Sequence, residues 1–388
     1  MGNEIKYQYT YFIQPFVISE KSYKNYIDSL LKNTKVKQKK FNPQKDAEID
    51  TYFNSSVKDV MFKELSGKET IEKTNMPSMC FEYVLEQNTQ AKMGEEDGIF
   101  FRIDKIEIFC FKQGICFLSI KTFLDEKANF SDVLNFNYRF KGINTNGDKL
   151  KAFEKISLQS DEFKEKKELI DLIKELTQNH VEKEEFYTYS YMCIDGEYWS
   201  RSNDFSNYEQ LFNKLISVVS ANQNIENNVD IIEKNDYTKF GIDKNSTALI
   251  TNSLETYNYT RLPLEYENEY RYSLIYALYQ KMALKEFGNK LKKTKNYQYT
   301  KKELTGFINT AWAKEITNNT FGSNLYKAWR NAIELENTYL EIVNKYEMVY
   351  KDERLRKNRL SNIIIWVILG ICVVTNIINV IILLNIKE

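Results

Sequence analysis

Segments in which apolar and polar residues alternate dominate roughly the first 200 positions, and this pattern predicts β-strands. The strongest prediction is a hairpin of two strands, 101–112 and 115–123, joined by a turn at Gln113-Gly114. Further strands are predicted at 5–18, 81–87, 134–143, 187–194 and 248–253. Helical spacing of apolar residues predicts intervening helices at 20–32 and 161–178. This mixture indicates an α+β fold, with a mixed α/β domain built in layers.

The pattern becomes helical after Pro263, the last proline of the chain. Helices are predicted at 264–287 and 301–316, followed by a break at 318–322. A third helix is predicted from Ser323, with apolar residues at alternating steps of four and three, which is a heptad seam. The seam comprises Ala328, Ala332, Leu335, Tyr339, Ile342, Tyr346 and Val349. No helix breaker follows before Ile386, so we expect one rod of roughly 95 Å.

The end of this predicted rod is apolar. The 24 residues from Ile363 to Ile386 include no Asp, Glu, Lys, Arg, His or Pro. A helix of about 20 apolar residues crosses a bilayer, so the segment predicts one membrane span. The preceding KDERLRKNR (351–359) is rich in Lys and Arg, and the N-terminus has no apolar signal-peptide core. We therefore expect a single-pass protein of the cell inner membrane, with the bulk of the chain in the cytoplasm.

These patterns divide the chain into four parts. Residues 1–262 are expected to form the cytoplasmic α/β domain, and residues 263–322 a helical pair that packs on the stalk. The stalk helix is expected at 323–360, and the membrane helix with a short tail at 361–388.

Composition gives little support for an enzyme. Charge is balanced, with 54 basic and 54 acidic residues, and the five scattered cysteines lack the spacing of a zinc site. The one histidine, His180, lies in a charged stretch and is expected at a solvated helix end. Asn146-Gly147 is expected to form a hairpin turn rather than a phosphate loop. Asp104 and Glu107 are a weak metal pair, because their spacing on a strand places them on opposite faces. We expect no catalytic residues, no bound metal and no cofactor.

The membrane segment carries polar residues that a simple anchor does not need. Cys372, Thr375, Asn376 and Asn379 fall along one side of the predicted helix, and we call them the polar stripe. One interpretation is a pore-lining or helix-association surface, since an amide in lipid needs a partner. The alternative is a compositional preference for Asn that the helix tolerates. In the first interpretation, a basic ring at the cytoplasmic mouth is formed by Arg354, Arg356, Lys357 and Arg359.

A second basic region interleaves lysines with tyrosines. It comprises Lys290, Lys292, Lys293, Lys295, Tyr297, Tyr299, Lys301 and Lys302. Such a pattern is typical of surfaces that hold an anionic nucleotide or oligonucleotide. The alternative is a solvated connection between two helices.

The order of these parts resembles that of the CorA-like membrane proteins. The matching segments are the hairpin at 106–122, the helix at 264–284 and the rod from Ser323 to Ile386. The Gly-Met-Asn signature of the family and its second span are absent. The resemblance implies a homo-oligomer, commonly a pentamer, with stalk helices around the axis. CorA-like proteins without the signature are also similar to membrane effectors of bacterial antiphage systems.

The functional prediction is a homo-oligomeric ion channel of four or five chains, gated by a ligand on its cytoplasmic domain and acting as an antiphage effector. One alternative is a CorA-type divalent-cation transporter variant. A second is a membrane-anchored binding or scaffold protein without a pore.

Overall fold

The computed structural model describes residues 4–66, 76–86, 89–94, 98–143, 155–160, 167–180, 184–202, 205–225, 229–293 and 297–385. The chain forms two compact units. Unit 1 comprises Met1–Ala283 and Asn309–Glu336, and unit 2 comprises Leu284–Ile308 and Asn337–Glu388. The mixed α and β content and the long C-terminal helix agree with the predicted fold class.

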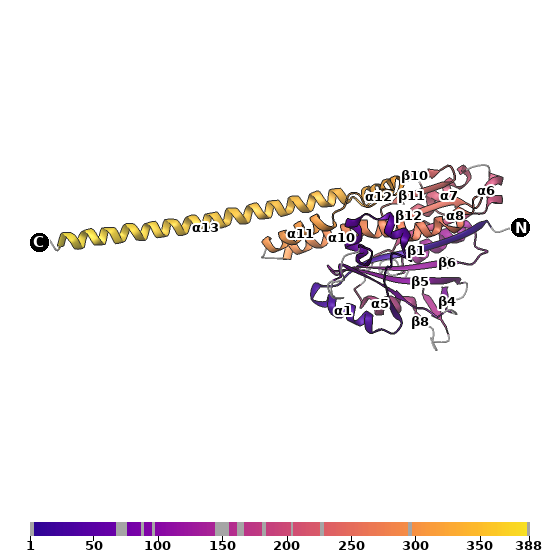
Figure 1. Ribbon diagram of the computed structural model, residues 1–388, viewed down its shortest axis with the longest axis horizontal. Coiled ribbons are helices and arrows are strands. Elements are labelled where there is room, and N and C mark those ends of the chain that lie inside the picture. The colour runs from indigo at the N-terminus through magenta and orange to yellow at the C-terminus, as the bar shows by residue number, and fades with distance from the viewer. Residues whose placement is uncertain are drawn as a thin grey trace. The chain divides into compact units, whose positions relative to one another are not determined.

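Unit 1 is built on a sheet of twelve described strands (Figure 1). The strands are β1 (Ile5–Val17), β2 (Val36–Lys39), β3 (Ser78–Tyr83), β4 (Gln90–Met93), β5 (Ile99–Phe111), β6 (Ile115–Leu124), β7 (Ile156–Gln159), β8 (Lys167–Glu168), β9 (Tyr187–Ile194), β10 (Asp230–Asn235), β11 (Thr238–Asp243) and β12 (Ser246–Asn252). Their order is β10-β11-β12-β9-β1-β6-β5-β4-β7-β8, and β3 joins β2 to β5. Strands β12 and β9 are parallel, while β1 is antiparallel to both of its neighbours.

The hairpin of β5 and β6 confirms the strongest sequence prediction. Gly114 ends its turn with a φ of +81°, a left-handed conformation that glycine adopts without strain. A Cβ atom at this position would lie 2.0 Å from the backbone oxygen of Ile18. The turn therefore needs glycine both for its backbone conformation and for the close approach of the chain after β1.

One face of the sheet is covered by apolar helices. Helices α1 (Glu20–Lys32), α4 (Phe130–Phe140), α5 (Leu169–Thr177) and α7 (Ser206–Ser217) contribute to one hydrophobic cluster with this face. Within it, the rings of Phe12 on β1 and Phe140 on α4 are stacked with centroids 3.8 Å apart. The prediction of a strand at 134–143 was wrong, because this segment belongs mainly to α4. A capping box between Asn129 and Asp132 starts that helix.

The opposite face is rich in tyrosine and packs against the helices from Leu262 onwards. These are α9 (Leu262–Glu265), the π-helix η4 (Tyr266–Tyr270), α10 (Arg271–Lys293) and α12 (Thr320–Ala332). Tyr189 on β9 stacks on Tyr266 at 4.0 Å and donates a hydrogen bond to its carbonyl oxygen. Trp329 on α12 donates from Nε1 to Thr247 Oγ1 on β12 at 2.8 Å.

The remaining helices are mostly short. They are α2 (Ala47–Tyr52), α3 (Ser55–Met61), η1 (Lys63–Leu65), α6 (Gly196–Ser202), α8 (Tyr257–Thr260), α11 (Tyr297–Ala311) and α13 (Leu335–Asn385). The helix predicted at 301–316 ends at residue 311, five positions early. The predicted turn at Asn146-Gly147 lies outside the described residues.

The rod predicted from Ser323 is two helices rather than one. It is interrupted at Ile333 and Glu334, and Glu334 adopts a left-handed conformation with a φ of +55°. Buried Arg330 fixes this break by hydrogen bonds from Nη1 to Gln280 Oε1 at 2.7 Å and to the Ala313 carbonyl at 3.0 Å. Its other nitrogen, Nη2, pairs with Glu336 in the first turn of α13.

In unit 2 the heptad seam forms the covered side of α13. Ile342 and Tyr346 are buried, and the Tyr346 hydroxyl donates to the carbonyl oxygen of Phe287 on α10 at 3.1 Å. Gly288 allows this approach, because a Cβ there would lie 2.8 Å from Ile342 Cδ1. At these two positions the seam residues of α13 therefore pack against α10.

Candidate functional site

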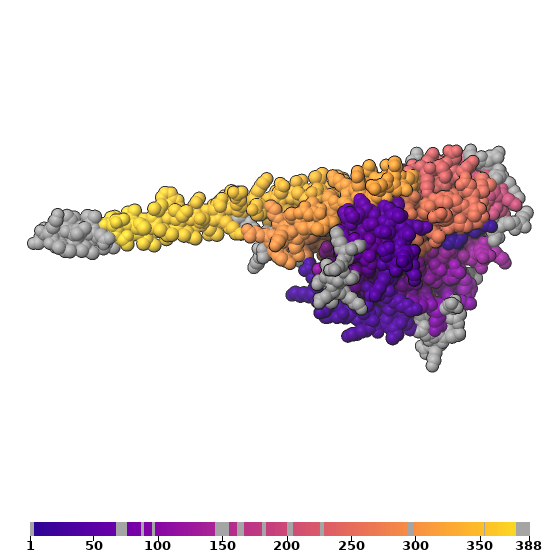
Figure 2. Space-filling view, viewed as in Figure 1, coloured from indigo at the N-terminus to yellow at the C-terminus, as the bar shows by residue number. Residues whose placement is uncertain are grey.

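The apolar segment of α13 is the first candidate site. Within the described residues, this is the one helix long and apolar enough to cross a bilayer, with a mean hydropathy of 2.2 in its most apolar stretch. Its large side chains are exposed from Ile363 to Ile377, in the part of α13 that is coloured yellow in Figure 2. Trp366 has the highest exposed fraction among them, 73%. The chain itself therefore does not cover this surface, and a bilayer suits its composition.

The polar stripe lies within this exposed surface. Thr375 Oγ1 donates to the carbonyl oxygens of Ile371 at 3.0 Å and Cys372 at 2.9 Å. Asn376 donates from Nδ2 to the Cys372 carbonyl at 2.9 Å. The hydroxyl group and one amide hydrogen are thus satisfied inside the helix, which reduces their cost in lipid. An Asn side chain carries a second amide hydrogen and an acceptor oxygen as well. The Asn379 side chain lies outside the described residues.

The predicted basic ring lies on the same helix, just before the apolar segment. Arg354, Arg356, Lys357 and Arg359 are all exposed. They are distributed around α13 rather than along one side, as expected for residues spaced at two, one and two positions. An inward-facing ring of all four is therefore not compatible with a straight helix.

The lysine-rich region predicted to bind an anion is partly engaged in structural contacts within unit 2. Lys290 lies 3.3 Å from Glu303, and the Lys301 ammonium lies 3.9 Å from the centre of the Tyr350 ring. Lys292, Lys302 and Tyr299 are exposed. Lys295 and the side chains of Lys293 and Tyr297 lie outside the described residues. The ion pair and the ring contact favour the structural interpretation for Lys290 and Lys301.

The structure also assembles a buried charge cluster that sequence patterns did not reveal. Glu267 in η4 receives hydrogen bonds from Lys121 on β6 at 2.6 Å, Lys105 on β5 at 2.8 Å and Tyr11 on β1 at 2.5 Å. Two residues later along β5, Glu107 lies 2.8 Å from Arg271 Nη2. Every contact joins residues far apart in sequence, so spacing alone carries no indication of the cluster.

Both carboxylates of this cluster are held in the charged form. Burial alone would raise the pKa of Glu267, but Lys121, Lys105 and Arg271 together hold this pKa well below its ordinary value. Burial acts on Glu107 in the same way, and Arg271 with the neighbouring lysines lowers its pKa overall. The Arg271 guanidinium lies between the rings of Tyr11 and Tyr272, 4.4 and 4.6 Å from their centres.

The expectation that Asp104 and Glu107 lie on opposite faces was wrong. A β-bulge between Ile103 and Lys105 shifts the register of β5 by one residue. Asp104 then lies 3.5 Å from Lys121, a member of the same cluster as Glu107. Each carboxylate is therefore paired with cations. In the part of the chain that the structure describes, no group of three or more His, Cys, Asp or Glu side chains is placed to hold a metal ion.

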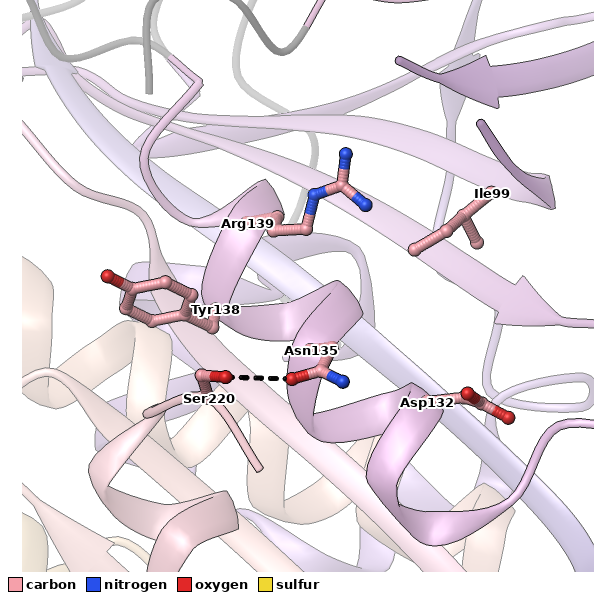
Figure 3. Close-up of a pocket in the computed structure, with 6 residues that line it drawn as sticks. All are labelled: Ile99, Asp132, Asn135, Tyr138, Arg139 and Ser220. Atoms are coloured by element: carbon pink, nitrogen blue, oxygen red, sulfur yellow. Dashed lines mark hydrogen bonds between the residues drawn. The ribbon is translucent and has the colours of Figure 1, made fainter. Parts of the chain in front are cut away.

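Two surface hollows of unit 1 were also absent from the sequence predictions. A cavity of about 320 Å³ is lined by Ile99, Asp132, Asn135, Tyr138, Arg139 and Ser220 (Figure 3). Asn135 points from α4 to Ser220 and accepts its hydroxyl hydrogen at 2.9 Å. A larger groove of about 1100 Å³ lies where β1 and β5 begin and β6 ends. Its lining mixes acidic, basic and aromatic residues and defines no particular chemistry.

Comparisons with known proteins add no assignment. No family model matches this sequence, and neither a curated protein nor a solved structure matches it. The resemblance to CorA-like proteins therefore stays a prediction from the order of the sequence segments.

Proposed function

We propose that this protein is a single-pass membrane protein whose copies associate through the polar stripe and form an ion-conducting assembly of four or five chains. The observation that carries the proposal is the position of Asn376, which is exposed on α13 as part of the polar stripe within a mainly apolar segment. We further propose that the assembly lies in the cell inner membrane with unit 1 in the cytoplasm, because Lys and Arg residues precede the span.

The physical argument starts from the Asn376 amide. Its bond to the Cys372 carbonyl uses one donor hydrogen, and the other polar groups of the side chain need partners in lipid. Between membrane helices, such groups bond across the interface and stabilise association by about 0.5–2 kcal/mol each. Closed cyclic symmetry presents the same face of every copy to one axis, so the stripe would line the centre.

The ligand that controls the assembly is proposed to be an anionic nucleotide or oligonucleotide. The supporting feature is the exposed group of Lys292, Tyr299 and Lys302 in unit 2. A ligand there shifts the assembly only if it binds the open and closed states with different affinity. Roles as an antiphage effector or as a divalent-cation transporter variant stay predictions that rest on the resemblance.

A second candidate function is a membrane-anchored binding or scaffold protein without a pore. It is favoured by the hydrogen bonds of Thr375 and Asn376 to carbonyl oxygens of their own helix. A helix that satisfies its polar groups internally can remain a monomer in lipid. The two functions differ in the number of chains per particle and in conductance.

The test compares the full chain with Asn376→Leu/Asn379→Leu after reconstitution in bilayers. We expect the parent to form particles of four or five chains and to show discrete conductance steps, and the double variant to lose both while still inserting. Val374→Leu/Ile377→Leu is the matched control, because it changes exposed apolar residues away from the polar stripe. Light scattering of the detergent-solubilised proteins gives the number of chains per particle, and single-channel recording in bilayers gives the conductance.

Two results would contradict the proposal. If the double Leu variant assembles and conducts as the parent does, the polar stripe has no role in either property. If the parent is a stable monomer without conductance, the anchored scaffold becomes the better explanation.

A further inference from the structure

The helical phase of α13 divides the four residues of the predicted basic ring into two pairs. Because α13 runs without a break from Leu335 to Asn385, one helical phase relates the basic residues to the span. Each residue turns the helix by about 100°, so positions around its axis can be compared. Arg354 lies within about 10° of the mean direction of Cys372, Thr375 and Asn376. Lys357 lies about 55° from the same direction. By the same measure Arg356 and Arg359 lie about 150° away, on the opposite side of the helix.

The height of Arg359 places it at the lipid headgroups, and Arg356 lies just beyond them, within reach of a long side chain. Arg359 precedes Ile363 by four residues, or about 6 Å of helix, and Arg356 precedes it by about 10 Å. The headgroup layer is about 5–8 Å thick on each side of the bilayer, and an Arg side chain extends further along the helix. Both side chains are exposed.

Trp366 supports the same orientation. It lies about 20° from Arg359 around the helix and about 10 Å further along it. With 73% of its surface exposed, the indole is available to the bilayer. Tryptophan is enriched at the boundary between headgroups and hydrocarbon, where one side of a span faces lipid. The order of Arg359 at the headgroups and Trp366 about 10 Å further along the helix matches that boundary.

We infer that Arg356 and Arg359 form a binding site for the phosphate groups of anionic phospholipids on the lipid-facing side of α13. A guanidinium presents two parallel N–H donors that fit a phosphate, and its charge complements the headgroup. Arg354 and Lys357 face the neighbouring helices instead. This division of the four residues rests on the proposed association through the polar stripe.

The experiment uses the fluorescence of the full chain in vesicles that contain brominated lipid, which quenches nearby indoles. Brominated phosphatidylglycerol is compared with brominated phosphatidylcholine at equal mole fraction. Trp366→Phe gives the background from Trp199, Trp312 and Trp329, which belong to unit 1. The quenching of Trp366 then reports the local fraction of anionic lipid on its side of the helix.

We expect the local fraction of phosphatidylglycerol at Trp366 to exceed the bulk fraction by at least about twofold and to fall with added salt. Arg356→Gln/Arg359→Gln should bring it to the bulk value. The matched variant Arg354→Gln/Lys357→Gln removes the same charge at nearly the same height and should leave the enrichment intact. Protection of unit 1 from added protease checks that both variants insert into the vesicles in the same orientation as the parent.

Two outcomes would overturn the inference, and both differ from failure of the proposed function. No enrichment in the parent would exclude the lipid site even if the chains assemble and conduct. Equal losses in both paired variants would show lipid on all sides of α13 and exclude the assigned face. The number of chains per assembly, measured on the same vesicles, shows whether the chains associate and so separates these two outcomes from a failure of the proposed function.

Discussion

Nη2 of Arg271 lies 2.8 Å from Oε2 of Glu107, and only 1% and 3% of these two side chains are exposed. The pair connects the start of α10 to the centre of the sheet. Removing one partner of a buried ion pair leaves the other charge without compensation in a poorly solvated place. The ion pair is thus a sensitive point in the attachment of the start of α10 to the sheet within unit 1.

We therefore predict that Arg271→Met lowers the free energy of unfolding by about 3–5 kcal/mol. Arg271→Met/Glu107→Leu should be less destabilised than the single variant, because it also removes the buried Glu107 carboxylate, which in the single variant keeps only Lys39 at 3.6 Å as an ion-pair partner among the described residues. Denaturant unfolding of the full chain in detergent, followed by circular dichroism, measures both. As a control, Lys174→Met removes an exposed pair with Asp171 at 3.3 Å and should change stability by less than about 1 kcal/mol. A small effect of Arg271→Met would show that the cluster is hydrated or repacks.

The ion pair also shows where sequence reasoning stops. The hairpin around Gly114 and the apolar segment after Ile363 could be predicted, because periodicity, turn chemistry and length are local properties of the chain. The contacts of Glu107 and Glu267 could not, since their partners come from other strands and from α10. No local pattern marks a carboxylate whose cation is more than a hundred residues away.

Two wrong predictions have local causes. The aromatic run in 134–143 looked like a strand, but the Asn129–Asp132 capping box and the helical spacing of its buried residues form α4. The break at Glu334 was missed because a left-handed residue is expected to be glycine or asparagine, and here it is glutamate. The break depends on buried Arg330, a tertiary contact.

The attachment of α12 to the sheet can be tested at Thr247. Its hydroxyl accepts the hydrogen bond of Trp329 Nε1 at 2.8 Å and lies 2.7 Å from the Tyr187 hydroxyl. Thr247→Val keeps the shape but leaves buried polar groups unsatisfied, so we expect a loss of about 1–3 kcal/mol in the free energy of unfolding.

The control for this position is Thr247→Ser, which keeps the hydroxyl group and loses one methyl. We expect it to cost about 1 kcal/mol, less than the valine variant. Both are measured by denaturant unfolding with intrinsic fluorescence, since Trp329 reports the contact directly. Equal losses for Ser and Val would show that packing of the methyl group, not the hydrogen bond, holds α12.

Alanine substitutions at two glycines are expected to change the stability in opposite directions. Gly114→Ala forces a Cβ to 2.0 Å from a backbone oxygen at a φ of +81°, so the hairpin must distort. Gly306 lies within α11, and a Cβ there meets nothing within 4 Å. We expect Gly114→Ala to lower the melting temperature, and Gly306→Ala to stabilise α11 by up to about 1 kcal/mol. Thermal unfolding followed by circular dichroism compares them. An unchanged melting temperature for Gly114→Ala would contradict the turn geometry.

The last prediction concerns pH and Glu269, a half-buried residue of η4. Burial, together with the nearby carboxylates of Glu265 and Glu48, raises the pKa of Glu269 from 4.5 to about 7, although Lys234 and Arg261 oppose the shift. The folded state then retains a proton that the unfolded chain releases between these two pKa values. The contribution of Glu269 to stability is therefore present at low pH and is lost as the pH rises towards 7.

Glu269→Gln removes this titration and keeps a neutral side chain of the same size. We expect the variant to be more stable than the parent above about pH 7, and the difference to shrink as the pH approaches 4.5. Denaturant unfolding of both proteins across this pH range measures the difference between their free energies of unfolding. The other titrating groups contribute equally to both proteins and cancel from this difference. A difference that does not change with pH would show that Glu269 ionises near its ordinary pKa. In that case water reaches the carboxylate. The surroundings of Glu269, Glu265 and Glu48 are then more open than the packing of Tyr270 against Tyr52 indicates.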